Sequence, residues 1–364
     1  MFDANDIHMM QNALALAWQG RFSTSPNPRV GCVIAHGSQI VGQGFHVRVG
    51  EPHAEVHALR QAGAMAQGAT AYVTLEPCSH YGRTPPCAKA LIESGVSRVV
   101  AAMTDPNPLV AGKGLAMLEA AGIRTQSGLL EQEARELNRG FLSRIERGRP
   151  FVRLKCAASL DSKTALSDGQ SQWITGEEAR ADVQILRAES CAVITGVGTV
   201  RADNPQLNVR RFPTLRQPAR VILDSRLQTP LDSKLIQDSG SPTLIATLSN
   251  NETLLQKYTN HTHVQILRPS ENNGRIDLHH LLALLAGQGY GEVMVEAGAT
   301  LAGAFLEADL VDEIVLYQAP KILGNQARSL FDLKENEQVL HHASRWKIIS
   351  SEIIGSDMKM VLKI

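Results

Sequence analysis

The sequence predicts an α/β protein of two domains, each built on a mostly parallel sheet. Short apolar strands alternate with helical segments along the 364 residues, a pattern typical of parallel sheets with helices on both faces. A chain of this length is expected to form two or three domains. The alternation is broken at 147–150, Arg-Gly-Arg-Pro, where a charged helix meets residues that end helices. We therefore place the domains at 1–147 and 148–364.

The first domain is expected to begin with a helix and a hairpin. The expected strands cover residues 30–35, 40–45, 71–75 and 98–103, the first two joined by a turn at His36-Gly37-Ser38. The expected helices cover 6–19, a segment from about 54, 86–94, 112–121 and 131–146. Asp6 is expected to cap the first helix and Gly95 to end the third.

The second domain continues the alternation and ends in a hairpin. Its expected strands cover 151–157, 192–195, 220–223, 243–247, 264–268, 292–295 and 314–318, followed by two antiparallel strands that turn at 355–357. Its expected helices cover 176–188, 277–286 and 300–308.

Composition excludes several classes of protein. The chain has 36 basic and 36 acidic residues, and this balance argues against binding nucleic acid, because phosphate contacts require surplus cations. No apolar run approaches the ~20 residues that cross a bilayer, and acids stand where a secretory signal has basic residues. Five scattered cysteines make a poor disulfide framework and favour a reducing compartment. We expect a cytoplasmic protein without membrane or nucleic-acid partners.

His53, Cys78 and Cys87 form the most informative pattern. One imidazole and two thiolates suit Zn²⁺, and three protein ligands leave the fourth tetrahedral position open for water. Bound zinc lowers the pKa of that water to about 7, and a carboxylate that is not a ligand must then move protons. Glu55 suits this role if His53 sits at a helix entry just after Pro52, because residues two apart on a helix point roughly 200° apart.

Other interpretations of these residues remain open. His53 and His57 have the spacing of metalloprotease helices, but that motif needs Glu directly after the first His, where Ala54 stands. A purely structural zinc would need a fourth protein ligand, for which His80 is the candidate. Taken singly, each residue is as typical of a buried cysteine or a surface histidine. As a set, His-x-Glu followed by Pro-Cys matches the zinc-deaminase signature, except in the spacing of the second cysteine.

Longer segments around this pattern carry a resemblance to one family. They cover residues 26–33 (PNPRVGCV), 42–46, 53–56, 74–87 and 105–108. The spacer that ends in Gly-Arg-Thr-Pro-Pro-Cys is typical of the bacterial bifunctional riboflavin-biosynthesis deaminase/reductase, whereas other zinc deaminases have two residues between the cysteines. The sequence resembles that family over nearly the whole chain.

The resemblance implies a cytidine-deaminase-like three-layer first domain with one zinc per chain. This domain would deaminate 2,5-diamino-6-(5-phosphoribosylamino)pyrimidin-4-one by attack of water at C2, with Glu55 shuttling protons as ammonia leaves. Asn27, His46, His80 and Arg83 are implied substrate contacts by their places in the matched motifs. Asn27, between two prolines, is equally typical of a turn, and His80 and Arg83 are equally typical of a solvated loop.

The second domain lacks a Gly-x-Gly-x-x-Gly motif after its first strand, so a conventional Rossmann prediction is weak. Strand 292–295 instead runs into a small-residue turn and a helix, which suits a pyrophosphate or is a plain strand-to-helix turn. Segments 152–161, 171–175, 199–205 and 295–298 resemble the reductase half of the same family. That resemblance implies a dihydrofolate-reductase-like fold that uses NADPH.

The resemblance also assigns contacts in the reductase half. Those implied for NADPH are Ala157, Trp173, Thr199, Asp203, Ser225, Gly298, Ala299, Thr300, Leu301, Ala302, Gly303 and Ala304. Those implied for the phosphorylated pyrimidine substrate are Ser171, Arg187, Leu207, Arg210 and Glu296. The two arginines suit the sugar phosphate, because guanidinium pairs with phosphate through two hydrogen bonds. Hydride from NADPH would reduce the C1 imine of the opened ribosylamine to a ribityl chain.

Several points stay open at this stage. Lys155 and Asp161 fit an active site or a buried ion pair, and Trp173 fits a cofactor contact or the core. Ser162 stands where the family usually has Gly, a residue that often marks positive φ. The alternative function is a nucleic-acid-editing zinc deaminase with an appended binding module, against which zero net charge and 4% aromatic residues count. A homodimer is the family-based expectation.

Overall fold

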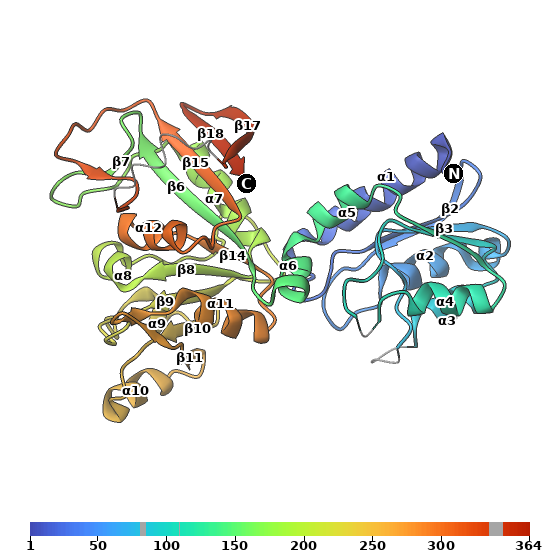
Figure 1. Ribbon diagram of the computed structural model, residues 1–364, viewed down its shortest axis with the longest axis horizontal. Coiled ribbons are helices and arrows are strands. Elements are labelled where there is room, and N and C mark those ends of the chain that lie inside the picture. Colours follow the sequence, from blue (N-terminus) through green and yellow to red (C-terminus); the bar gives the residue numbers. More distant parts are fainter. Residues whose placement is uncertain (81–84, 109, 335–344) are drawn as a thin grey trace. The chain divides into compact units, whose positions relative to one another are not determined.

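The computed structural model describes residues 1–80, 85–108, 110–334 and 345–364. The chain divides into two compact units, Met1–Gly148 and Arg149–Ile364 (Figure 1). Each described apolar core consists of residues from one unit only. Within the described part of the chain, no helix is long and apolar enough to cross a membrane.

The first unit is a five-stranded sheet between two helical layers. The strand order is β2-β1-β3-β4-β5, with β1 antiparallel to both of its neighbours and β3, β4 and β5 parallel. The strands are β1 Gly31–His36, β2 Gln39–Phe45, β3 Thr70–Val73, β4 Arg98–Ala101 and β5 Arg124–Ser127. The helices are α1 Ala4–Trp18, η1 Gln19–Phe22, α2 Ala54–Ala62, η2 Gly63–Ala66, α3 Cys87–Glu93, α4 Lys113–Ala120, α5 Glu131–Leu137 and α6 Arg139–Arg147.

Alternate strand residues fill the two cores of this unit. Ile34 and Val99 pack with α2, α3 and α4, whereas Val33 and Val100 pack with α1, α5 and α6 on the other face. This alternation follows from the two-residue period of a strand, and it gives the three layers expected.

Two glycines bring α2 close to the sheet. A Cβ atom on Gly42 would lie 2.2 Å from the carbonyl oxygen of Ala58, and one on Gly44 would lie 2.4 Å from Cβ of His57. Only a residue without a side chain permits this approach of helix to strand. The contact sets the distance of α2 from the sheet, and with it the positions of His53 and Glu55 at the start of the helix.

Three expectations for the first unit were wrong. The helix expected over 131–146 is two helices, because Asn138 leaves helical geometry and its side chain bonds the backbone N–H and C=O of Arg29 at 2.7 and 2.9 Å. The cap of α1 is Asp3; Asp6 lies in its first turn and pairs with Arg98. Strand β5 was missed because its four residues are polar and only partly buried.

The second unit is a nine-stranded sheet in the order β11-β10-β9-β8-β14-β6-β15-β18-β17. The first seven of these strands are parallel, and β18 and β17 are antiparallel. The main strands are β6 Phe151–Ser159, β8 Ala192–Gly196, β9 Ala219–Leu223, β10 Thr243–Ala246, β11 Val264–Leu267, β14 Glu292–Val295, β15 Glu313–Ala319, β17 Lys347–Ile354 and β18 Asp357–Lys363. Short strands are β7 Lys163–Ala165, β12 Glu271–Asn272, β13 Arg275–Ile276 and β16 Arg328–Ser329.

Helices cover both faces of this sheet. They are α7 Glu177–Glu189, α8 Val197–Asp203, α9 Lys234–Gln237, α10 Glu252–Thr259, α11 Leu278–Gly287 and α12 Ala299–Glu307. Helices α11 and α12 pack on one face, and α7, α8, α9 and α10 pack on the other. The three expected long helices and the final hairpin are present; α8, α9 and α10 were not expected, because their short segments show little apolar periodicity.

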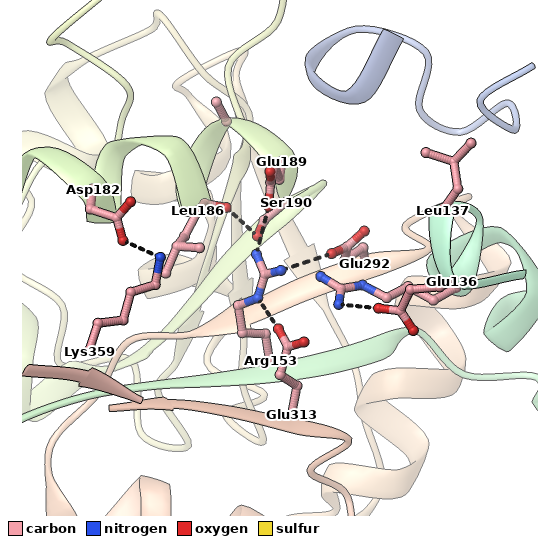
Figure 2. Close-up of polar contacts among 12 residues, drawn as sticks. Glu136, Leu137, Arg153, Asp182, Leu186, Glu189, Ser190, Glu292, Glu313 and Lys359 are labelled. Atoms are coloured by element: carbon pink, nitrogen blue, oxygen red, sulfur yellow. Dashed lines mark hydrogen bonds and ion pairs between the residues drawn. The ribbon is translucent and has the colours of Figure 1, made fainter. Parts of the chain in front are cut away.

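A buried charge cluster lies where β6, β14 and β15 begin. Arg153 donates to Glu313 at 2.6 Å and to Glu189 at 3.2 Å, and its guanidinium lies 3.7 Å from Glu292 (Figure 2). Arg153 and Glu313 are 5% and 4% exposed at their side chains, so these charges depend on one another rather than on water. The cluster occupies the edge of the sheet opposite to the carboxyl ends of its parallel strands.

Candidate metal centre and reductase site

His53, Cys78 and Cys87 come together at one edge of the first sheet. His53 Nδ1 lies 3.3 Å from Cys87 Sγ and 3.7 Å from Cys78 Sγ, and all three ligand atoms lie within 4.8 Å of one another. A tetrahedral zinc with ordinary Zn–N and Zn–S bonds separates its ligands by roughly 3.5–3.8 Å. The donor set and its spacing therefore fit a zinc ion with three protein ligands.

Local backbone geometry places these ligands. His53 is the N-cap of α2, with extended φ of −71° and ψ of 166°, so its side chain leaves the helix axis. Cys87 is the first residue of α3. Its backbone N–H donates to Cys78 Sγ at 3.3 Å, and the next N–H, from Ala88, donates to the carbonyl of Cys78 at 3.1 Å. The segment after β3 is thus fastened to the start of α3.

The electrostatics of the cluster favour a thiolate. A hydrogen bond from Cys87 lowers the pKa of the Cys78 thiol to about 4, against the opposing effect of burial, with further help from His53. The same contact raises the pKa of Cys87. The hydrogen bond to Cys78 raises the pKa of His53. A negative charge is therefore already stable on Cys78, which suits a cation ligand.

Glu55 lies in the first turn of α2, two residues after His53, and is 3% exposed. Burial and the nearby Cys78 raise the pKa of its carboxyl to about 6. Its Oε2 atom is buried and has no hydrogen-bond partner among the residues that the structure describes. A carboxyl that titrates near neutral pH and keeps one oxygen free is suited to accept and return a proton.

Two of the four weaker predictions lie beside the cluster. The His46 ring lies edge-on to His53, with centroids 5.4 Å apart. His46 Nδ1 is 3.2 Å from the carbonyl of Pro52, so Nδ1 carries the proton and Nε2 accepts from Asn27 Nδ2 at 3.1 Å. His80 is exposed. Arg83 lies outside the described residues.

The competing metal interpretations lack support. Neither His57 nor His80 belongs to the converging group, which has three members among the residues that the structure describes. His57 Nε2 is instead buried, with no hydrogen-bond partner in the described ranges of the chain. Among the described residues, the geometry therefore supports the three-ligand arrangement.

In the second unit, the residues expected to bind the cofactor follow the carboxyl ends of parallel strands. Ala157 lies near the end of β6, and Thr199 and Asp203 lie on α8, directly after β8. Ser225 follows β9 by two residues, and Gly298 is the N-cap of α12, whose early turns hold residues 299–304. Open α/β sheets bind ligands at this edge.

Trp173 is 59% exposed, so the alternative that it belongs to the core is wrong. The guanidinium of Arg180 lies 4.5 Å from the centre of its ring. Ser171 lies two residues earlier on the same loop, ahead of α7, and is half-buried.

Arg187 and Glu296 form a two-pronged ion pair. Arg187 Nε and Nη2 donate to the two carboxylate oxygens of Glu296 at 3.0 and 2.7 Å, and Nη1 donates to the carbonyl of Asn208 at 3.1 Å. Burial opposes ionisation of Glu296, but Arg187 and Lys155 outweigh it and lower its pKa to about 2. Arg187 is thus engaged by protein, whereas the side chain of Arg210 is exposed.

Lys155 and Asp161 do not pair with each other within the described part of the chain. Asp161 accepts from Ser159 Oγ at 2.5 Å and from the backbone N–H groups of Leu323 and Gly324. These hydrogen bonds lower the pKa of Asp161 to about 2. Asp161 therefore anchors the 323–324 loop, and the buried ion pair considered from sequence is wrong for it. Leu207 is buried, with φ of 51°.

Sequence reasoning gave no role to Glu76 or Asn208. Glu76 stands immediately before the Pro77-Cys78 pair and is 6% exposed. The sequence shows only an acidic residue two positions before Cys78, and its burial became visible in the structure. No local pattern pointed to Asn208, whose carbonyl binds a guanidinium 21 residues away in sequence.

Two family models match the chain. Residues 150–360 match the RibD C-terminal domain, and residues 3–103 match the cytidine and deoxycytidylate deaminase zinc-binding region. The riboflavin biosynthesis protein RibD of Escherichia coli (strain K12) is 48% identical, over 97% of this chain and 98% of its own length. That of Haemophilus influenzae is also 48% identical, over 99% and 97%.

Solved structures agree with these relatives. Acinetobacter baumannii RibD, form 1, superposes with a TM-score of 0.91 at 46% identity, covering 99% of this chain and 98% of that one. A diaminohydroxyphosphoribosylaminopyrimidine deaminase/5-amino-6-(5-phosphoribosylamino)uracil reductase from Thermotoga maritima has a TM-score of 0.86 at 31% identity, covering 98% of each chain. The resemblance noted from sequence is confirmed, and the nucleic-acid-editing alternative is not supported. The chain belongs to the RibD family of bifunctional deaminase/reductases of riboflavin biosynthesis.

Proposed function

We propose that the first unit deaminates 2,5-diamino-6-(5-phosphoribosylamino)pyrimidin-4-one at the His53, Cys78 and Cys87 centre. Zinc bound there supplies a water acidic enough to attack at neutral pH. Glu55 Oε2 takes a proton from the attacking water and delivers it to the amino group, which leaves C2 as ammonia. His46 and Asn27 contact the pyrimidine beside His53. The observation that carries this proposal is the buried, unpartnered oxygen of Glu55 next to a three-ligand metal cluster.

Glu55→Gln tests the proton transfer. We expect the variant to keep about one zinc per chain and to lose deamination by at least the ~10²–10⁴-fold that general acid–base catalysis provides. Glu51→Gln is the matched control, because Glu51 pairs with Arg48 on the surface and should keep full activity. Metal analysis and ammonia release are the measurements. Deamination by Glu55→Gln at the unaltered rate would remove Glu55 from the mechanism.

We further propose that the second unit reduces the deaminated product. The residues that follow the strand ends would hold NADPH, which would supply the hydride for reduction of the C1 imine of the opened ribosylamine to a ribityl chain. Glu296, held ionised by Arg187, stabilises the cationic imine, and Arg210 reaches the phosphate. Ser171 and Leu207 complete the substrate contacts. Positioning and charge stabilisation are what such a hydride transfer asks of the protein.

Arg187→Ala tests this assignment. With the deaminated intermediate supplied directly, the natural chain should consume NADPH, and the variant should show a KM for the intermediate raised by about tenfold or more, because Glu296 loses its orienting partner. Arg275→Ala, at an exposed position on β13, is the control. An unchanged KM in Arg187→Ala would exclude that residue, and no NADPH consumption by folded natural protein would restrict the function to deamination.

We also propose a cytoplasmic homodimer joined through β17. This strand is the sheet edge, and Ile348, Ile349 and Ile353 on it are 62%, 58% and 69% exposed. A long apolar edge strand is a template for pairing with another chain. Five free cysteines support a reducing compartment.

A further inference from the structure

Glu76 is a buried carboxylate to which the reaction gives no role. It lies on the segment that leaves β3, directly before Pro77-Cys78, and is 6% exposed. Its Oε2 accepts backbone N–H groups from Asp105 at 3.1 Å and Gly112 at 2.9 Å, and its Oε1 accepts those of Gly114 at 2.8 Å and Leu115 at 3.3 Å. Within the described part of the chain, the hydrogen bonds to its carboxylate thus all come from backbone amides.

These four amides come from the loop after β4 and from the first turn of α4. The same part of the chain touches the metal-ligand segment again, because a Cβ atom on Gly114 would lie 1.9 Å from the carbonyl oxygen of Pro77. The backbone N–H of Glu76 donates to the carbonyl of Met103 at 2.9 Å. The segment that carries Cys78 is consequently held against α4 by the hydrogen bonds of Glu76 and by the contact of Pro77 with Gly114. We call these contacts the Glu76 clasp.

The second thiolate ligand depends on the same clasp. Helix α4 packs against α3, which begins with Cys87. Cys78 is thus two residues from the carboxylate, and Cys87 is connected to it through one helix-to-helix contact. The positions of both sulfur atoms therefore depend on the carboxylate of Glu76.

We infer that Glu76 is a positioning residue for the metal centre, which fixes the two thiolate sulfurs before the metal arrives. The inference rests on the proposed role of His53, Cys78 and Cys87 as ligands. A carboxylate is required because both of its oxygens only accept, and each receives two N–H groups. Glutamine would turn an NH₂ group toward two N–H donors and open the clasp. Groups that orient metal ligands typically contribute 10–100-fold to metal affinity or activity.

Glu76→Gln in the full-length chain tests the inference, with Asp6→Asn as matched control. Asp6 is also a buried carboxylate of the first unit, 2% exposed, but it pairs with Arg98 at the opposite end of β4 from Met103. The readouts are the Zn²⁺ dissociation constant by chelator competition and the absorption bands of bound Co²⁺, which report thiolate geometry. We expect Glu76→Gln to bind Zn²⁺ at least ten times more weakly and to shift the Co²⁺ bands. Asp6→Asn should change neither the Zn²⁺ dissociation constant nor the Co²⁺ bands, even where it lowers the melting temperature as much as Glu76→Gln does.

Unchanged Zn²⁺ binding and Co²⁺ bands in Glu76→Gln, or the same changes in Asp6→Asn, would overturn the inference. NADPH consumption with supplied intermediate should be normal in both variants, which shows that the second unit is intact. If Glu76→Gln loses the melting transition of the first unit, Gly114→Ala decides, because its added Cβ would press on the Pro77 carbonyl at 1.9 Å and on Glu76 Oε1 at 3.2 Å and so disturb the same contacts. Unweakened Zn²⁺ binding in that variant overturns the inference. Zinc retained by Cys78→Ser would instead contradict the proposed centre itself.

Discussion

Ser162 has a left-handed backbone, with φ of 57°, in the turn between β6 and β7. Its side chain is exposed, while its N–H donates to Ser159 and its carbonyl accepts from Leu330 at 3.0 and 3.1 Å. The turn is held in place by these bonds, so the conformation is imposed on the serine. This is the backbone region that glycine tolerates best.

We therefore predict that Ser162→Gly stabilises the second unit. A left-handed backbone costs an L-residue roughly 1–2 kcal/mol, which glycine avoids. Glycine also has more freedom in the unfolded chain, which lowers the stability of the folded state by roughly 0.5–1 kcal/mol. The net gain in the free energy of unfolding should therefore be about 0.5 kcal/mol. Denaturant unfolding of that unit measures it. Ser167→Gly, at a neighbouring turn residue without positive φ, should give no gain. A loss of stability in Ser162→Gly would show that the turn does not strain the serine.

At the residue scale, sequence reasoning succeeded where short-range backbone geometry decides. The convergence of His53 with Cys78 and Cys87 could be predicted because a helix start after Pro52 and a helix start after Pro86 each place one ligand. Glu76 could not be assigned, because its four partners lie 29 to 39 residues further along the chain. Nothing in a local pattern says which backbone amides a buried carboxylate will meet.

At the scale of elements, the β17–β18 hairpin is fixed as well as exposed. Asp357, the first residue of β18, accepts the backbone N–H of Gly176 at 2.6 Å, which ties the hairpin to the start of α7. On β18, Lys359 bridges Asp182 of α7 at 2.8 Å and Glu352 of β17 at 3.3 Å (Figure 2 shows the first of these). A rigid edge with exposed isoleucines is suited to pair with a copy of itself, because little conformational freedom remains to be lost.

We predict that Ile353→Lys converts the proposed dimer to monomer. A lysine on an edge strand opposes pairing, because its charge would have to leave water. Light scattering after size-exclusion chromatography measures the mass. Ile322→Lys is the control, since Ile322 is 75% exposed but lies off β17. If Ile353→Lys has the same mass as a dimeric natural protein, the interface lies elsewhere.

Most elements could be predicted from periodicity, and the errors have physical causes. The break at Asn138 depends on hydrogen bonds to Arg29, 109 residues earlier, which no helical pattern contains. Strand β5 pairs with β4 through its backbone, so its polar sequence gives no apolar signal. Tertiary contacts override local propensity in both cases.

At the scale of the whole molecule, the two units have separate cores. No described apolar core combines residues from both Met1–Gly148 and Arg149–Ile364. The proposed metal ligands belong to the first unit, and the strand-end residues expected to bind NADPH belong to the second. Each ligand should therefore stabilise one unit only.

We predict two melting transitions, one for each unit. A chelator should lower the melting temperature of the first unit only. Loss of zinc removes binding free energy equal to RT ln(1 + [L]/Kd), about 4 kcal/mol when free metal is 1,000 times its Kd. Calorimetry with and without chelator measures the shift, and NADPH should raise the other transition. Cys78→Ser should not respond to chelator. A single transition, or equal shifts of both, would show that the units unfold together.

The close approach of α2 to Gly42 and Gly44 limits which substitutions these two positions can accept in evolution. Neither glycine takes part in chemistry, yet any larger residue would lift α2 and carry His53 and Glu55 away from the two thiols. Natural selection should therefore guard these two positions as strictly as the ligands themselves. A saturation library screened for riboflavin-independent growth would be expected to show them nearly intolerant of change.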